Sequence, residues 1–373
     1  MEELTSAELG ARIRDARDRR GLNQSELGAR VQMDRTVVNK IEAGIRKVSA
    51  LELSQFAEAL GVRMASFFTD PVPAIVSHRS SQGTDVVDSQ IDALLDQLVV
   101  DVELVQDLGG LDRRDAPDAL MEMPTSYAEA ESMAQRARKI VDLDNDTHAN
   151  DLQRLFEAAG LLVFSRDLGT DTADAGTVLL RDGTGVSIVN STQKVGRRRL
   201  AAAHEFGHFL VADEYSIDWR VTGNDLQQTE ALLDRFARAF LLPEKGLRAV
   251  WESRMSADDL RAAAVVTAST FRVDMATLAR RLTELDLVTG AQAGQIRGVR
   301  TTRTDIIEHD LHAHDDMTGT TQPPVFQKAV LQLVRRELIS EARALDLLWG
   351  TVGEDELPEP HIPENVDLWQ YAS

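Results

Sequence analysis

The stretch RRRLAAAHEFGHFLVADE, residues 197–214, is the most informative part of this sequence. His204 and His208 lie four positions apart in an apolar segment, and this spacing is about one turn of an α-helix. Both imidazoles can therefore project from one helix face and share a tetrahedral metal ion. Glu205 stands beside the first histidine, close enough to meet a water molecule on that ion. The pattern predicts a helix-borne Zn²⁺ site for hydrolysis, with Glu205 as the catalytic general base.

The alternative is that this HExxH pattern arose by chance. Its surroundings argue against chance, because the residues before the first histidine are alanines and those after the second are apolar, as in a buried helix. Two histidines and a glutamate on a buried face would cost free energy without a ligand to satisfy them. The context therefore favours a metal site.

A second helix is predicted over TEALLDRFARAFLLP, residues 229–243. Glu230 and Asp234 are four positions apart and share one face of it, while Phe236 and Phe240 belong to its apolar stripe. We expect Glu230 to be the third zinc ligand, and Asp234 to accept the N–H of a ligating histidine from outside the ligand shell. The alternative is a pair of solvated acids on an exposed helix face.

The HEFGH motif, Glu230 six positions before the Phe236-Ala237 pair, and the LLP that follows resemble the ImmA/IrrE metallopeptidases. The resemblance covers about residues 126–290. It implies a zincin-like fold, a bound Zn²⁺ ion and cleavage of a specific regulatory protein. The sequence departs from the usual family pattern at Leu232 and Leu233, where glutamate and alanine are common, but neither position is a ligand.

The N-terminal region, from residue 8 to about residue 70, reads as several short helices. Gln24 opens the second helix, where its amide can reach a phosphate. Asp34 is a good N-cap for a third helix that runs to about Ala43, and Gly44 is its stop signal. The segment predicts a compact all-helical unit.

Residues 8–70 resemble the XRE-type helix-turn-helix repressors nearly throughout. The resemblance implies binding to a double-stranded DNA operator as a homodimer and a structural ion pair between Arg17 and Glu42. We expect base contacts in the major groove from the third helix and phosphate contacts from its flanks. The predicted base contacts are Arg35, Thr36 and Lys40, and the predicted phosphate contacts are Gln24, Asn39, Arg46 and Lys47. The alternative is a helical bundle that binds only proteins.

The composition indicates the cell compartment of the protein and the part of the chain that can contact DNA. The chain has 373 residues, a formal charge of −20 and no cysteine, so histidine and carboxylate must supply any metal ligands and a reducing cytoplasm fits. It shows neither a signal peptide nor an apolar run of the ~20 residues that a membrane span needs, so we expect a cytoplasmic protein without membrane contact. Residues 1–70 hold eleven of the 41 Lys and Arg and eleven of the 61 Asp and Glu. The acidic excess lies elsewhere, and DNA contact should be local to the N-terminus.

The pattern predicts a mainly α chain with a small β-sheet, the α+β class. Helical periodicity over 89–108 suits packing within the domain or against a second subunit. Three strands are predicted ahead of the HExxH helix, over 161–165, 177–180 and 186–190. The expected parts are a helix-turn-helix domain over 1–70, a linker over 71–88, a metallopeptidase domain over 89–290, a polar flexible loop over 291–324 and a helical C-terminal segment over 325–373.

A histidine-rich stretch, EHDLHAHDD at 308–316, lies in that polar loop. It could bind metal, but it lacks periodicity, and such tracts are compositional signals of low specificity. A flexible acidic loop is the favoured interpretation.

Two functions follow from these features. The first is a DNA-binding transcriptional regulator whose zinc peptidase domain cleaves a specific regulatory protein, such as a repressor. The alternative is an autorepressor, or the antitoxin of a toxin-antitoxin or phage-type module, whose metallopeptidase fold senses a signal or binds a partner such as a toxin. The sequence does not separate them.

Overall fold

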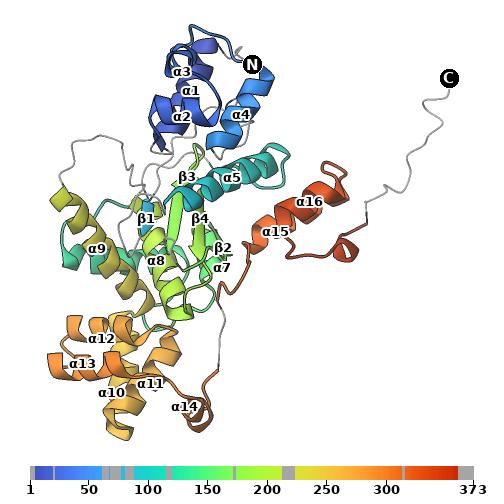
Figure 1. The fold of residues 1–373 in the computed structure, drawn as a ribbon. Helices are drawn as coiled ribbons and strands as arrows, with labels where there is room; N and C mark the ends of the chain where they lie inside the picture. Colours follow the sequence, from blue (N-terminus) through green and yellow to red (C-terminus); the bar gives the residue numbers. More distant parts are fainter. Residues whose placement is uncertain are drawn as a thin grey trace, which may run out of the picture. The chain divides into compact units, whose positions relative to one another are not determined.

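The computed structural model contains two compact units, one formed by residues 1–74 and 84–94 and the other by residues 75–83 and 95–373. Helices dominate both units, and one small β-sheet accompanies them, which confirms the predicted α+β class (Figure 1). No helix in the described ranges is long and apolar enough to cross a membrane. The structure describes residues 5–19, 22–60, 67, 77–79, 88–114, 120–170, 174–211, 223–312 and 316–359.

The first unit contains the predicted short helices: α1 (Ser6–Arg19), α2 (Gln24–Arg30), α3 (Arg35–Glu42) and α4 (Ala50–Leu60). Their apolar faces share one core, which includes Ile13, Leu27, Val38 and Phe56. Asp34 is the N-cap residue of α3, as predicted, although its side chain makes no capping hydrogen bond. Gly44 has φ of +70°, a left-handed conformation that glycine adopts without a steric penalty, so it ends the helix as predicted.

The second unit is built around a mixed four-stranded sheet with the order β1-β3-β4-β2. Strand β2 pairs in parallel with β4, which is antiparallel to β3, and β3 is antiparallel to β1. The three predicted strands are confirmed, whereas β1 lies in the segment expected to be a linker. The strands are β1 (Ser77–Arg79), β2 (Leu161–Arg166), β3 (Ala175–Leu179) and β4 (Gly185–Asn190).

Helix α8 (Val195–Val211), which carries the HExxH motif, packs mainly against β3 and β4. The packing is close at Gly185, where an added Cβ would lie 2.5 Å from the Phe209 ring. On its other side α8 meets α9 (Gly223–Leu241) through aromatic side chains, with Phe206 and Phe240 edge to face at 5.5 Å. Two flanking layers therefore hold the motif helix along its length.

The helices before the sheet are α5 (Asp88–Asp107), α6 (Tyr127–Ile140) and α7 (Leu152–Ala159). The apolar stripe predicted for the first of them is buried within the single chain at Leu95, Leu98, Val102 and Val105. It therefore packs inside the chain, and a second subunit is not needed to cover it.

After α9 the chain continues as α10 (Glu244–Ala257), α11 (Leu260–Phe271) and α12 (Met275–Glu284). The expectation of a flexible loop over 291–324 is wrong for its first half, which holds most of α13 (Gly290–Gly298) and all of α14 (Arg303–Glu308). The polar residues there have a structural role, since Thr289 and Thr302 each form a capping box at a helix start.

The chain then forms α15 (Pro324–Arg335) and α16 (Glu341–Leu348), which lie in the segment expected to be helical, followed by a 3-10 turn (Glu354–Glu356). Most of the predicted linker and the last part of the predicted C-terminal segment lie outside the described residues. The proposed domain limits remain predictions.

Candidate metal centre and DNA-binding surface

Helices α8 and α9 bring His204, His208 and Glu230 together. The Nε2 atoms of the two histidines are 3.1 Å apart, and Glu230 places Oε2 3.1 Å from Nε2 of His204 and Oε1 3.5 Å from Nε2 of His208. Ligand atoms from all three residues lie within 4.8 Å of one another, a spacing that one metal ion can bridge. Two imidazoles and a carboxylate are a donor set that suits zinc.

The structure also places Asp234 beside the first histidine. Its Oδ1 atom lies 3.1 Å from Nδ1 of His204, on the opposite side of the ring from Glu230. A carboxylate in this position can hold the imidazole in one orientation and one tautomer. Glu230 and Asp234 thus lie on either side of the His204 ring, and their roles as metal ligand and orienting carboxylate stay predictions.

Glu205 follows His204 on α8, and its side chain is fully buried. Both of its carboxylate oxygens lack a hydrogen-bond partner among the described residues. Burying an unsatisfied carboxylate is costly, so a ligand, ion or water is needed at this place. The residues present therefore fit a metal centre that binds water next to Glu205.

The charge state of Glu230 suits a metal ligand. Burial raises its pKa, but the hydrogen bond with His204 and the nearby charge of His204 and His208 outweigh this effect. The net direction is downward, which favours the ionised carboxylate that coordinates a cation.

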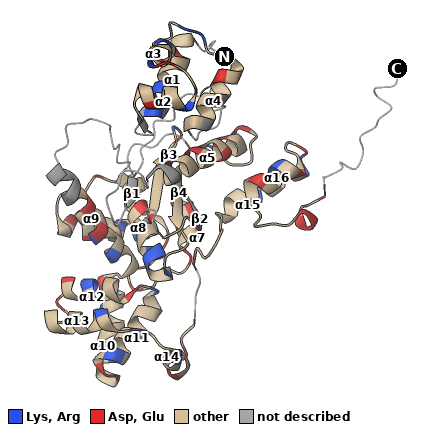
Figure 2. Ribbon diagram, viewed as in Figure 1, with Lys and Arg blue, Asp and Glu red and all other residues tan. Residues whose placement is uncertain are grey.

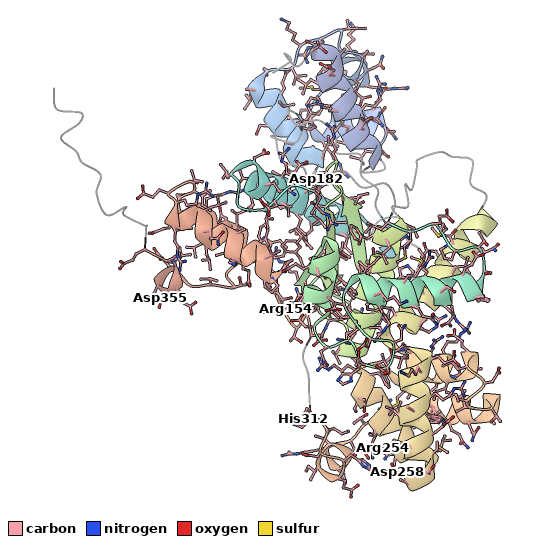
Figure 3. The ribbon with its side chains drawn as sticks, turned by 180° about the vertical axis from the view of Figure 1, so that it is seen from behind. Arg154, Asp182, Arg254, Asp258, His312 and Asp355 are labelled. Carbon is pink, nitrogen blue, oxygen red and sulfur yellow. The ribbon has the colours of Figure 1, made fainter. Side chains whose placement is uncertain are left out.

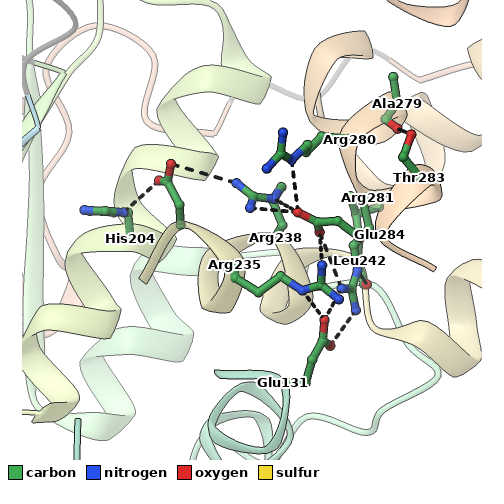
Figure 4. Close-up of polar contacts among 11 residues, drawn as sticks. Glu131, His204, Arg235, Arg238, Leu242, Ala279, Arg280, Arg281, Thr283 and Glu284 are labelled. Carbon is green, nitrogen blue, oxygen red and sulfur yellow. Dashed lines mark hydrogen bonds and ion pairs between the residues drawn. The ribbon is translucent and has the colours of Figure 1, made fainter. Parts of the chain in front are cut away.

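A chain of ion pairs continues from Asp234 into the helices on the far side of α9 (Figure 4). Arg238 lies 3.9 Å from Asp234 and 2.8 Å from Glu284 of α12. Glu284 also contacts Arg235 at 3.3 Å, and Arg235 in turn lies 2.5 Å from Glu131 of α6. The sequence alone does not reveal this network, because its members lie on three helices that are far apart along the chain.

The arginine run before the motif is used for structure. Arg197 lies 2.8 Å from Asp174, and Arg198 donates to Thr318 at 2.7 Å. Arg199, fully buried, pairs with Asp316, which also contacts Arg272 at 3.2 Å. These side chains fix the start of α8 against neighbouring segments.

Asp316 is the last residue of the histidine-rich stretch, so the expectation of a free acidic loop is wrong at that end. His312, labelled in Figure 3, follows α14. Within the described part of the chain, the group able to hold a metal ion is made of His204, His208 and Glu230.

On the first unit, the exposed face of α3 carries the predicted DNA contacts. Val38 and Ile41 face the core, and basic residues lie along the helix and in the turn after it (Figure 2). The exposed residues are Arg35, Thr36, Asn39, Lys40, Arg46 and Lys47. These residues therefore lie on the solvent-exposed face of the unit, where Asn39 accepts a hydrogen bond from Gln24 and Arg46 pairs with Glu52 at 2.7 Å.

Two details refine this surface. The Arg17–Glu42 ion pair is present, with Nε of Arg17 2.6 Å from Oε1 of Glu42. Gln24, expected to reach a phosphate, is half-buried and donates its amide to Glu42 at 2.9 Å and to Asn39 at 3.2 Å. Its amide therefore also braces α2 against α3.

Comparison with known families agrees with both parts of the chain. Residues 13–67 match the helix-turn-helix family model, and residues 156–283 match the model of the IrrE N-terminal-like domain. The chain joins an XRE-type helix-turn-helix domain to an ImmA/IrrE-like domain. The second match contains α8 and α9, and thus all residues of the candidate metal centre.

A curated relative is described as a helix-turn-helix regulator. The uncharacterized HTH-type transcriptional regulator y4wC of Sinorhizobium fredii is 32% identical over 80 residues, which are 21% of this chain. The chain spans about half of that relative, 56% of its length. A solved structure of Bacillus thuringiensis PlcR with the peptide PapR7 and DNA aligns over 91% of both chains, with 12% identity and a TM-score of 0.17, which is too low to carry an argument.

Proposed function

We propose that this chain is a DNA-binding transcriptional regulator whose ImmA/IrrE-like domain hydrolyses a peptide bond in a specific regulatory protein. The observation that carries the proposal is the buried Glu205 carboxylate, which lacks a hydrogen-bond partner among the described residues and stands next to a His204, His208 and Glu230 group. Structural histidines and acids would pair with one another and leave no such group unsatisfied.

His204, His208 and Glu230 would hold Zn²⁺, and Asp234 would fix the orientation of His204. When bound, Zn²⁺ polarises the peptide carbonyl and makes water more acidic. Glu205 accepts the proton of the attacking water and passes it to the leaving amine. The buried position of Glu205 favours both transfers, since fewer solvent molecules compete for the proton.

The helix-turn-helix domain would direct this activity to a promoter. One such module gives weak specificity, so we propose that two copies bind half-sites about one helical turn apart. Arg35, Thr36 and Lys40 would read bases, and the flanking polar residues would contact phosphates.

The decisive experiment replaces Glu205 by Gln. The amide keeps the size of the side chain but cannot accept a proton, so Glu205→Gln should retain zinc and operator binding while losing cleavage and induction in cells. Zinc content, operator affinity and induction are measured on the same protein, with an Arg35→Ala variant as the DNA-binding control. Normal induction by Glu205→Gln would refute the protease and favour a domain that senses a signal or binds a partner.

A further inference from the structure

We propose that Arg238 is a positioning residue for the metal centre, because it connects Asp234 to Glu284 of α12. The inference rests on the proposed function, since it concerns the orientation of a ligand in the same centre. It extends that proposal from residues that surround the metal to a residue that contacts neither the metal nor its ligands.

The first observation is a row of functional groups along α9. Glu230, Asp234 and Arg238 are four positions apart and therefore follow one another on a single helix face. The first faces Nε2 of His204, the second faces Nδ1 of the same ring, and the third faces Asp234. Ligand, orienting carboxylate and arginine thus lie along one stripe.

The second observation concerns the two oxygens of Asp234. Oδ1 lies 3.1 Å from Nδ1 of His204, and Oδ2 lies 3.9 Å from Nη1 of Arg238. The Asp234 side chain is 35% exposed, so packing alone does not fix its rotamer. A cation beside the second oxygen disfavours rotamers in which the carboxylate turns to solvent. Arg238 therefore helps to hold the Asp234 carboxylate next to Nδ1 of His204.

The third observation is that Arg238 is itself held in place. Its side chain is 10% exposed, and Nε and Nη2 lie 2.9 and 2.8 Å from Oε1 of Glu284, which is 8% exposed. Two donors on one carboxylate oxygen restrict the guanidinium far more than a single exposed ion pair would. Figure 4 shows this path from His204 to Glu284 as a continuous line of contacts.

Arg238 could have a different role, that of joining α9 to α12 with no effect on the metal. The two roles differ in their relation to Asp234. If Arg238 acts through Asp234, removing Arg238 lowers zinc affinity only while Asp234 is present. If it only joins helices, its loss lowers the stability of the metal-free protein and leaves zinc affinity unchanged.

The test measures zinc affinity of the full chain by competition with a chelator, together with thermal unfolding of the metal-free protein. Arg238→Ala should weaken zinc binding about 2- to 10-fold, less than the roughly 10- to 100-fold loss expected for Asp234→Ala. The double variant should match Asp234→Ala alone, because both changes remove the same effect. Arg238→Lys keeps the charge without the two-donor geometry and should fall between the wild type and Arg238→Ala.

Arg280→Ala is the matched control. Arg280 contacts the same Glu284 at 3.3 Å from within α12, and its side chain is 65% exposed. Its loss should leave zinc affinity unchanged. Equal zinc affinities of Arg238→Ala, Arg280→Ala and the wild type would overturn the inference, as would additive losses in the double variant.

The absorption spectrum of Co²⁺ in the site provides a second readout, which still applies if Arg238→Ala folds poorly. A turned imidazole should change the Co²⁺ bands of Arg238→Lys, and a spectrum identical to that of the wild type would count against the inference. Absence of zinc binding by the wild-type protein would remove the metal centre itself. If the wild type binds zinc and Arg238→Ala binds it with the same affinity, only the positioning role of Arg238 is refuted.

Discussion

Oδ1 of Asp234 lies 3.1 Å from Nδ1 of His204, whereas Nε2 of the same ring faces Glu230 and His208. With the proton on Nδ1, the lone pair on Nε2 is directed to the place where the other ligand atoms meet. The geometry thus assigns one ring nitrogen to the carboxylate and the other to a cation. It also identifies which residues should control metal content.

Zinc content should depend on the two motif histidines and not on those of the histidine-rich stretch. We expect about one zinc per chain in the purified wild-type protein and almost none in a His204→Ala/His208→Ala variant, because one carboxylate cannot hold the ion alone. The control is His309→Ala/His312→Ala, which should keep its zinc. Elemental analysis decides between them, and full zinc in the first variant would exclude the proposed site.

Sequence-specific DNA binding should depend on the exposed face of α3. Arg35→Ala should weaken binding to the preferred operator by about 1–3 kcal/mol and relax the base preference at one position. Arg254→Ala removes an exposed arginine of α10 and should leave the footprint and affinity unchanged. Selection of preferred sites, followed by titration at two salt concentrations, measures both effects. An unaltered footprint for Arg35→Ala would remove it from the predicted contacts.

Stability should fall in acid partly through Glu131, the α6 member of the ion-pair network. Burial raises its pKa, but hydrogen bonds and charge from Arg281 and Arg235 outweigh this effect, and the net pKa lies below its usual range. A folded-state pKa below the unfolded value contributes stability that is fully present above the unfolded pKa, about 4.3, and is lost as the pH falls through the folded-state value.

The advantage of the wild type over Glu131→Gln in the free energy of unfolding should therefore shrink as the pH falls below about 5. Denaturant unfolding at several pH values measures it. Glu122→Gln, at an exposed position shortly before α6, serves as the control. A difference that stays constant with pH would show that the Glu131 pair does not titrate in this range.

The sequence predicts which side chains lie together in the candidate centre, because the information needed is local. HExxH at helical spacing places two candidate ligands and the candidate base on one helix, and the spacing of Glu230 and Asp234 places both on one face of the next. The Arg238 to Glu284 contact could not be predicted in this way, since arginines and acids on an amphipathic helix look like a solvated face. Arg238 and Glu284 become buried only because α9 packs against α12.

The other misses have similar causes. Strand β1 has three residues in a segment whose Pro, Ser and Gly content indicates a linker, and it forms by pairing with the edge of β3. Helices α13 and α14 lack a strong apolar stripe, so periodicity did not reveal them. Their capping boxes, Thr289 with Gln292 and Thr302 with Asp305, were the local signal that could have found both.

The two histidines belong to α8 and Glu230 belongs to α9, so an ion held by all three is a reversible crosslink between segments of the chain. Binding energy at such a crosslink is also folding energy, because the unfolded chain offers no assembled site. By mass action, the free energy of unfolding would then rise with the logarithm of free zinc above the dissociation constant. The lifetime of the folded regulator would in that case follow the zinc supply of its surroundings.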